Sequence, residues 1–299
     1  MRKVLPFTFF WPFSQLPDRL RGSALNDFAQ AGAEGVVLTD GILSETLSSP
    51  AAIVNWRRMV ADAGLRFIDA HSPFGPLSDL ACPVPEAVPQ MLSMHRRCIA
   101  ICAEFGVKSI TIHVGRPTSF SNDTEALFAN ILRSTEALLP AAEEAGVVIC
   151  IENIWDAVNT ADRLIRVVDT FRSPWLGVCW DSGHAQLTRS EAPNVPEQAC
   201  RASWRNCGYD EPEHGDDYLG KLLPHIVTCH LHTNDRMSDR HWLPTDPRGL
   251  TDWASELPQL FSAPRLMQMQ SEASVRAENP FTPRDEVESL RALTERFAP

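Results

Sequence analysis

Short apolar runs alternate with longer amphipathic stretches along all 299 residues, and this alternation predicts an α/β protein with a single (β/α)8 barrel of the TIM class. Eight of the apolar runs have the length of strands, and no change of composition divides the chain. An open, doubly wound sheet is the alternative, but no glycine-rich phosphate-binding turn follows any of these runs. We therefore expect one barrel domain over residues 1–299.

The expected strands are rich in Val, Ile, Phe and Cys and lack strict polar alternation, as is typical of strands covered on both faces. In chain order they are residues 4–11, 35–40, 65–71, 109–115, 147–153, 176–181, 226–233 and 266–272. The first strand is the most aromatic. Its Trp11 suits either a sugar pocket or core packing, and we expect it to contact substrate.

Helices are expected between the strands, for example at residues 85–106, 122–146 and 161–171. Gly64, Gly106 and Gly146 stand just before a strand, where the end of a helix often needs a left-handed residue. Residues 185–217 break this regular pattern, because they are rich in Pro, Arg and acidic residues. They follow the sixth strand and are expected to form a long loop or insertion over the barrel mouth.

Charge and cysteine content exclude several classes of protein. With 27 basic and 38 acidic side chains the net charge is −11, which disfavours nucleic-acid and anionic-membrane binding. The 8 cysteines include no CxxC pair and fall mostly in apolar runs, so we expect reduced, buried thiols.

No signal peptide or long apolar span is recognisable, and a cytoplasmic protein is expected. Whether the chain forms a homo-oligomer stays open.

Ionisable side chains gather where the expected strands end. These are His71, His113, Glu152, Asp181 with His184, His230 and His232, Asp239 and His241, and Glu272. In a barrel these ends meet at one face, where active sites are built. Buried carboxylates repel one another unless a cation neutralises them. Mixed imidazole and carboxylate ligands suit Mn, Zn, Co or Fe better than Ca.

The motifs around these residues resemble the sugar phosphate isomerase/epimerase superfamily, the xylose isomerase-like TIM barrel group that also contains endonuclease IV-type AP endonucleases. In order they are IDAHSPFGPLSDL, ITIHVGR, CIEN, CWDSGHA, CHLHTND, SDRHWLP, GLTDW and QSE. The resemblance covers nearly the whole chain. WDSGHA and HLHTND followed by DRH are its most specific parts.

The resemblance implies one divalent metal, Mn, Zn, Co or Mg, held by residues that match Glu152, Asp181, His230 and Glu272. Periodicity does not choose between His230 and His232, although the spacing to Asp239 and His241 favours His230. Substrate contacts are implied for His184 and Arg236, and we expect them also for His71 and His113. AP endonuclease members hold up to three metals, with further ligands matching His71, His113, His184, Asp239 and His241. Asp239, His241 and His232 are therefore candidates for an additional metal site.

We expect a divalent-metal-dependent isomerase or epimerase of a sugar, keto-sugar or related polyol, with proton transfer by Glu152 and Glu272 through a metal-stabilised enediolate. The alternative is a trinuclear-metal phosphodiesterase that acts on abasic DNA. The acidic net charge disfavours this alternative. A non-catalytic sugar-binding or metal-binding module is the third hypothesis, and the presence of both glutamates disfavours it.

Overall fold

A computed structural model describes residues 5–118, 120–189, 199–212 and 217–297. Its eight strands are all parallel and lie in the order β1-β8-β7-β6-β5-β4-β3-β2. They are β1 (Phe7–Phe9), β2 (Gly35–Leu38), β3 (Arg66–His71), β4 (Ser109–Ile112), β5 (Val148–Glu152), β6 (Leu176–Asp181), β7 (Ile226–Leu231) and β8 (Met269–Ser271). Because β1 also contacts β2, the sheet forms a nearly closed barrel, and the predicted single (β/α)8 fold is confirmed.

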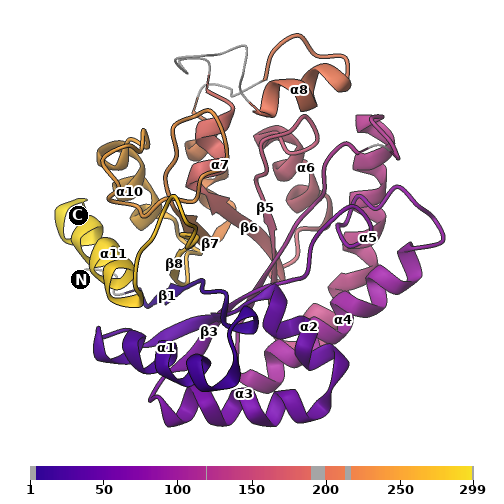
Figure 1. Ribbon diagram of the computed structural model, residues 1–299. Helices are drawn as coiled ribbons and strands as arrows, with labels where there is room; N and C mark the ends of the chain where they lie inside the picture. The colour runs from indigo at the N-terminus through magenta and orange to yellow at the C-terminus, as the bar shows by residue number, and fades with distance from the viewer. Residues whose placement is uncertain (1–4, 119, 190–198, 213–216, 298–299) are drawn as a thin grey trace.

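Helices surround the strands on the outside (Figure 1). They are α1 (Asp18–Gln30), α2 (Asp40–Ser48), α3 (Pro50–Asp62), α4 (Val88–Phe105), α5 (Thr124–Ala145), α6 (Ala161–Phe171), α7 (Ser182–Leu187), α8 (Ala199–Asn206), α9 (Tyr218–Leu222), α10 (Trp253–Ser262) and α11 (Pro283–Phe297), with short 3-10 helices η1 (Phe13–Gln15) and η3 (Leu223–His225). The C-terminal α11 packs beside α1, so the two ends of the chain complete the ring.

Local sequence signals explain several helix boundaries. Gly106 and Gly146 take left-handed backbone angles, φ 78° and 63°, at the ends of α4 and α5, which confirms their predicted capping role. Asp123 begins α5 by accepting hydrogen bonds from the amides of Glu125 and Ala126. The sixth strand has its predicted bounds, residues 176–181, whereas the other strands are shorter than predicted. The first contains only residues 7–9, because the chain turns into η1 after Pro12.

The two faces of the barrel strands differ in chemistry. Outward side chains such as Phe9 and Ile110 belong to the apolar core shared with the helices. Inside the barrel, the buried carboxylate of Asp69 accepts hydrogen bonds from Ser109 Oγ at 2.6 Å and Thr228 Oγ1 at 2.5 Å. Gln268 Nε2 also donates to Ser109 Oγ. The predicted burial of both strand faces is therefore correct, but much of the interior is polar.

The stretch after β6 contains the described helices α7, α8 and α9, whereas residues 190–198 and 213–216 of the predicted insertion lie outside the described residues. Trp204 on α8 is buried and donates from Nε1 to the carbonyl of Trp155, at 2.8 Å, in the loop after β5. This contact places α8 beside the loops that follow the strands. Figure 1 shows α8 beyond the ends of β5 and β6.

All 8 cysteines are free, and all except Cys207 are buried, as predicted. Burial raises the pKa of Cys98 to about 12, so its thiol is a poor nucleophile. Among the residues that the structure describes, no helix combines the length and the apolar character needed to cross a bilayer.

Candidate metal centre and active-site cavity

The predicted strand-end residues meet at the carboxyl end of the barrel. His71, Glu152 and Asp181 end β3, β5 and β6, whereas His113 and Glu272 directly follow β4 and β8. In parallel strands these ends point the same way, so side chains that are far apart in the sequence come together. The structure thus assembles the ring of imidazoles and carboxylates that the sequence predicted.

His230 Nδ1 lies among three carboxylates. It is 2.9 Å from Glu152 Oε1, 3.0 Å from Glu272 Oε2 and 3.7 Å from Asp181 Oδ2. One ligand atom from each of these four residues falls within 4.8 Å of the others, and all four side chains are buried. Thr111 Oγ1 lies 3.4 Å from His230 Nε2, which orients the ring with Nδ1 toward the carboxylates. We refer to these four residues as the central group.

Strong electrostatic coupling holds the central group together. Burial raises the pKa of Glu152, but His230 and His113 outweigh burial and lower it well below its usual value. Burial also raises the pKa of Glu272, but His230 outweighs burial and lowers it. For His230 burial lowers the pKa, whereas Cys179, Glu272 and Glu152 raise it well above normal. The carboxylates of Glu152 and Glu272 are therefore ionised and require positive charge beside them.

The central group fits a divalent cation. Glu152 Oε2 and Glu272 Oε2 are buried and accept no hydrogen bond from any described residue. Buried carboxylate oxygens without donors are rare in folded proteins, because each loses its hydration without compensation. A cation would satisfy them, and one imidazole with three carboxylates is a ligand set that suits Mn, Co, Fe or Zn.

His232 occupies a different position from His230. Its Nε2 lies 3.1 Å from both carboxylate oxygens of Asp181, and it does not belong to the central group. Gly183 allows this approach, since a Cβ there would lie 2.0 Å from His232 Cε1. Asp181 also accepts the amide of His184 at 2.6 Å as the N-cap of α7. The geometry places His230 in the central group, whereas His232 contacts that group through Asp181.

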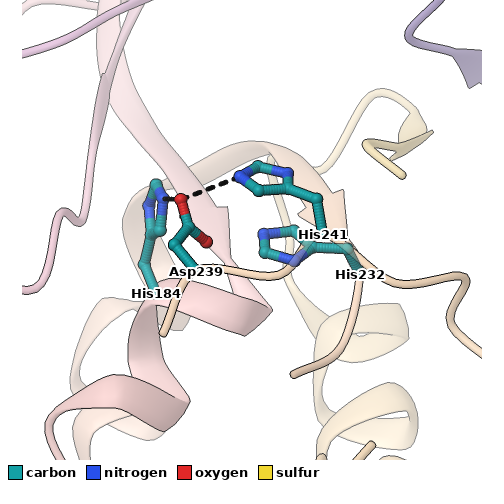
Figure 2. Close-up of side chains that lie close together, drawn as sticks. All are labelled: His184, His232, Asp239 and His241. Atoms are coloured by element: carbon teal, nitrogen blue, oxygen red, sulfur yellow. Dashed lines mark hydrogen bonds and ion pairs between the residues drawn. The ribbon is translucent and has the colours of Figure 1, made fainter. Parts of the chain in front are cut away.

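A second group consists of His184, His232, Asp239 and His241, which we call the outer group. Figure 2 shows the Asp239 carboxylate between the imidazoles of His184 and His241. Asp239 Oδ2 lies 2.9 Å from His241 Nε2 and 3.6 Å from His184 Nε2, and the rings of His232 and His241 stack with centroids 3.9 Å apart. His241 has a left-handed φ of 48°, a strained conformation for a non-glycine residue.

Charge coupling also governs the outer group. Burial lowers the pKa of His241, but Asp239 outweighs burial and raises it to about 9. Burial raises the pKa of Asp239, while His241 and His184 hold it well below normal. Its Oδ1 is buried and accepts no hydrogen bond from the described residues. The outer group is therefore a second candidate for a cation.

Glu152 connects the central group to two more imidazoles. Its Oε2 lies 2.9 Å from His113 Nε2, without hydrogen-bond geometry, and 3.7 Å from His71 Nε2. His71 Nδ1 lies 2.9 Å from the Ser72 carbonyl, a contact that orients the ring toward Glu152. His71, Glu152 and His230 also satisfy the spacing of a metal-binding group.

A cavity of about 360 Å³ opens above these groups. Seven of the predicted site residues line it, namely His71, His113, Glu152, His184, Asp239, His241 and Glu272. Asp181, His230 and His232 are not in its wall. The cavity therefore presents both Glu152 and Glu272 to a ligand, with His230 underneath them.

Two residues predicted to contact substrate lie elsewhere. Trp11 is buried against Phe28 and Phe281, because alternation along the strand turns Phe10 into the cavity instead. Arg236 donates to Gln186 Oε1 and to the Leu250 carbonyl, and it is not in the cavity wall. The structure does not bring either side chain to the cavity.

Sequence reasoning missed several wall residues, including Phe74, Asp79, Arg116 and Arg276. Phe74 stacks on His113 with centroids 4.5 Å apart and is 52% exposed. Phe74 and Asp79 fall in the motif after His71, and Arg116 follows His113 by three residues, so their closeness to strand ends was the available signal. Arg276 lies in the loop after β8 and carries no comparable signal.

Comparison with known proteins identifies relatives of this fold. The sequence profile of the family described as xylose isomerase-like TIM barrel matches residues 25–268. The uncharacterized protein y4fM of Sinorhizobium fredii is 28% identical over 233 residues, which cover 70% of this chain and 67% of that protein.

Two solved structures share the fold at low sequence identity. Apo 3-keto-D-glucoside 4-epimerase YcjR from E. coli superposes with a TM-score of 0.70 at 16% identity, covering 98% of this chain and 100% of that chain. A D-tagatose 3-epimerase-like protein gives a TM-score of 0.72 at 17% identity, with the same coverage.

Proposed function

The chain belongs to the xylose isomerase-like TIM barrel family, and on that premise we propose that it is a divalent-metal-dependent isomerase or epimerase of a sugar, keto-sugar or related polyol. The observation that carries the proposal is the pair Glu152 and Glu272. They approach His230 Nδ1 from strands β5 and β8, at 2.9 and 3.0 Å, and both line one cavity. The epimerase names of the fold relatives support the same class of reaction.

Isomerisation or epimerisation beside a carbonyl requires a carbon-bound proton to leave and to return. Glu152 and Glu272 are ionised, and each has a buried oxygen that accepts no hydrogen bond from a described residue. Each carboxylate has two oxygens, so while one binds the cation the other can take a proton from a substrate carbon. Because the two carboxylates come from strands on different sides of the cavity, one can remove the proton and the other can return it.

A divalent cation held by Glu152, Asp181, His230 and Glu272 would supply Lewis-acid stabilisation of the developing negative charge. His71, His113 and His184 present imidazoles to the cavity, where they can hydrogen-bond to substrate hydroxyl groups. Phe10, Phe74 and Trp155 provide apolar walls that exclude water and pack against the sugar ring.

The test is exchange of the substrate α-proton with solvent. Metal-loaded protein is incubated with a panel of ketoses in deuterated water, and deuterium incorporation is followed by NMR. Glu152→Gln and Glu272→Gln should each slow exchange by about 100- to 10,000-fold, because each removes a proton-transfer group. The exposed Glu278, six residues after Glu272 on the same loop, gives the control Glu278→Gln. Exchange at the wild-type rate in both site variants would refute the assignment.

A second candidate function is phosphodiester hydrolysis at abasic DNA by a trinuclear metal cluster. The observation in its favour is that the central group, the outer group and His71 with His113 adjoin one another through Glu152 and Asp181. Elemental analysis after purification separates the two functions. One metal per chain supports the isomerase, whereas three tightly held zinc ions together with cleavage of an abasic oligonucleotide would support the nuclease.

A further inference from the structure

A second and larger hollow adjoins the active-site cavity. The active-site cavity holds about 360 Å³, near the lower end of the range for ligand pockets, whereas its neighbour holds about 870 Å³. Arg116 and Trp155 line both, so the two hollows share a wall. The mechanism above uses only the smaller one. We call the larger one the adjoining hollow.

The walls of the adjoining hollow combine flat apolar surfaces with neutral polar groups. Pro76, Phe120 and Trp155 are among the apolar ones, and Phe120 is 60% exposed. Ser203 and Asn206 of α8 add a hydroxyl and an amide. A sugar ring presents C–H faces to aromatic surfaces and hydroxyl groups to such polar side chains. The chemistry of the wall thus matches a carbohydrate.

Hydrogen bonds join the segments that form this wall. Asn122 Nδ2 donates to the Asn206 carbonyl at 2.7 Å, which connects the loop after β4 to α8. Trp204 Nε1 donates to the Trp155 carbonyl at 2.8 Å, which connects α8 to the loop after β5. These bonds fix three separate segments around one space, as a preformed binding site requires.

Arg116 lies at the junction of the two hollows and is the only charged side chain among the described residues that line the larger one. It is exposed and makes no hydrogen bond or ion pair with a described residue. Burial raises the pKa of Asp79 and of Asp156, and Arg116 lies near enough to both to oppose part of that rise. Its guanidinium donors are therefore available to oxygen atoms of a ligand that spans the junction.

We propose that the adjoining hollow is a subsite for a second sugar ring, so that the substrate is a disaccharide or related glycoside rather than a free monosaccharide. This inference rests on the proposed function. The reacting ring lies in the smaller cavity between Glu152 and Glu272, and the second ring packs on Trp155 and Phe120. Arg116 hydrogen-bonds to oxygen atoms near the bond that joins the rings.

The experiment compares D-fructose with its glucosyl derivatives palatinose, maltulose and turanose on the metal-loaded protein. Calorimetry measures binding, and NMR measures α-proton exchange in deuterated water. At least one disaccharide should exceed D-fructose by about tenfold or more in affinity and in kcat/KM. Ser203→Trp fills the adjoining hollow and should bring this ratio close to one. Ala202→Trp, an exposed substitution on the same helix outside the wall, should leave the ratio unchanged.

The outcomes separate this inference from the proposed function. Exchange of D-fructose with no preference for any disaccharide, or a preference that survives Ser203→Trp, would overturn the subsite alone. A disaccharide preference in binding that depends on Ser203, without any α-proton exchange, would support the subsite and overturn the proposed reaction. Absence of both binding and exchange across the panel would overturn both.

Discussion

Two sets of buried carboxylates lie in the same barrel but differ in how they are satisfied. Deep in the barrel, Asp69 accepts hydrogen bonds from the Ala70 amide, Ser109 Oγ and Thr228 Oγ1. At the mouth, Glu152 and Glu272 each keep a buried oxygen that accepts no hydrogen bond from a described residue, although His113 Nε2 and His230 Nδ1 lie 2.9 and 3.0 Å away. Neutral donors complete the first site, whereas the second has the unpaired oxygens that a cation would satisfy. The contrast separates a carboxylate that supports the fold from carboxylates that bind or react.

The largest effect that tests this contrast is metal removal. A cation that binds only the folded state stabilises it by about 4 kcal/mol at a free concentration a thousand times its Kd. Thermal unfolding with excess Mn²⁺ and with a chelator should show this difference in wild type. In Asp181→Asn the difference should largely disappear, because a ligand of the central group is lost. An equal metal response in the variant would place the cation elsewhere.

Glu256 tests whether a buried oxygen without a donor is enough to mark a metal site. Its Oε2 is unsatisfied, but it lies apart from the central and outer groups and faces Gln186 and Arg189. Burial raises its pKa to about 7, with Arg189 opposing the rise. Because Arg189 does not outweigh burial, this carboxyl meets the cost of burial by keeping its proton.

The pH dependence of stability follows from this shift. Between its ordinary pKa of 4.5 and about 7, Glu256 is ionised in the unfolded chain but protonated in the folded one, so stability falls as pH rises and levels off above pH 7. Glu256→Gln removes this titration. From pH 4.5 to pH 7 the free energy of unfolding of the variant, measured by urea unfolding, should therefore rise by about 3 kcal/mol relative to that of wild type. A constant difference across this range would contradict the assignment.

Asp69→Ala tests the buried carboxylate whose hydrogen bonds come from the protein itself. It removes the acceptor of three hydrogen bonds and should lower the free energy of unfolding by about 2 kcal/mol, since loss of the buried charge offsets part of the cost. Urea unfolding measures the loss, and Mn²⁺ titration of the folded variant should give the wild-type affinity. Weaker metal binding would show that Asp69 does more than support the fold.

The smallest predicted effect concerns His232, whose Nε2 contacts both carboxylate oxygens of Asp181. His232→Gln keeps a polar side chain but loses the imidazole, and it should weaken Mn²⁺ binding by about tenfold. His225→Gln, a half-buried residue of η3 away from the cavity, is the matched control. A loss as large as that in Asp181→Asn would instead mean that His232 binds the cation directly.

Fold and site were predictable to different depths. The barrel was predictable from the spacing of apolar residues and from the alternation of strands and helices along the chain. Most strands are buried on both faces, and most helices that cover them have one apolar side. Strand-end positions predicted that a larger set of imidazoles and carboxylates meets at one face, whereas the choice of Glu152, Asp181, His230 and Glu272 came from the family resemblance. Trp11 was harder, because a one-residue difference in alternation decides whether it or Phe10 faces inward. The direction of the Arg236 side chain depended on a loop conformation with a left-handed φ of 61°, which the spacing of apolar residues does not predict.

Mn²⁺ affinity, measured by calorimetry on metal-stripped protein, tests the central claim most directly. Wild type, Asp181→Asn and Asp69→Asn are compared under one set of conditions. We expect Asp181→Asn to lose about 100-fold or more in affinity, because a ligand is removed from the central group, while Asp69→Asn should stay within about twofold of wild type. Equal losses in the two variants, or no binding by wild type, would contradict the claim that the unsatisfied carboxylates form the working site.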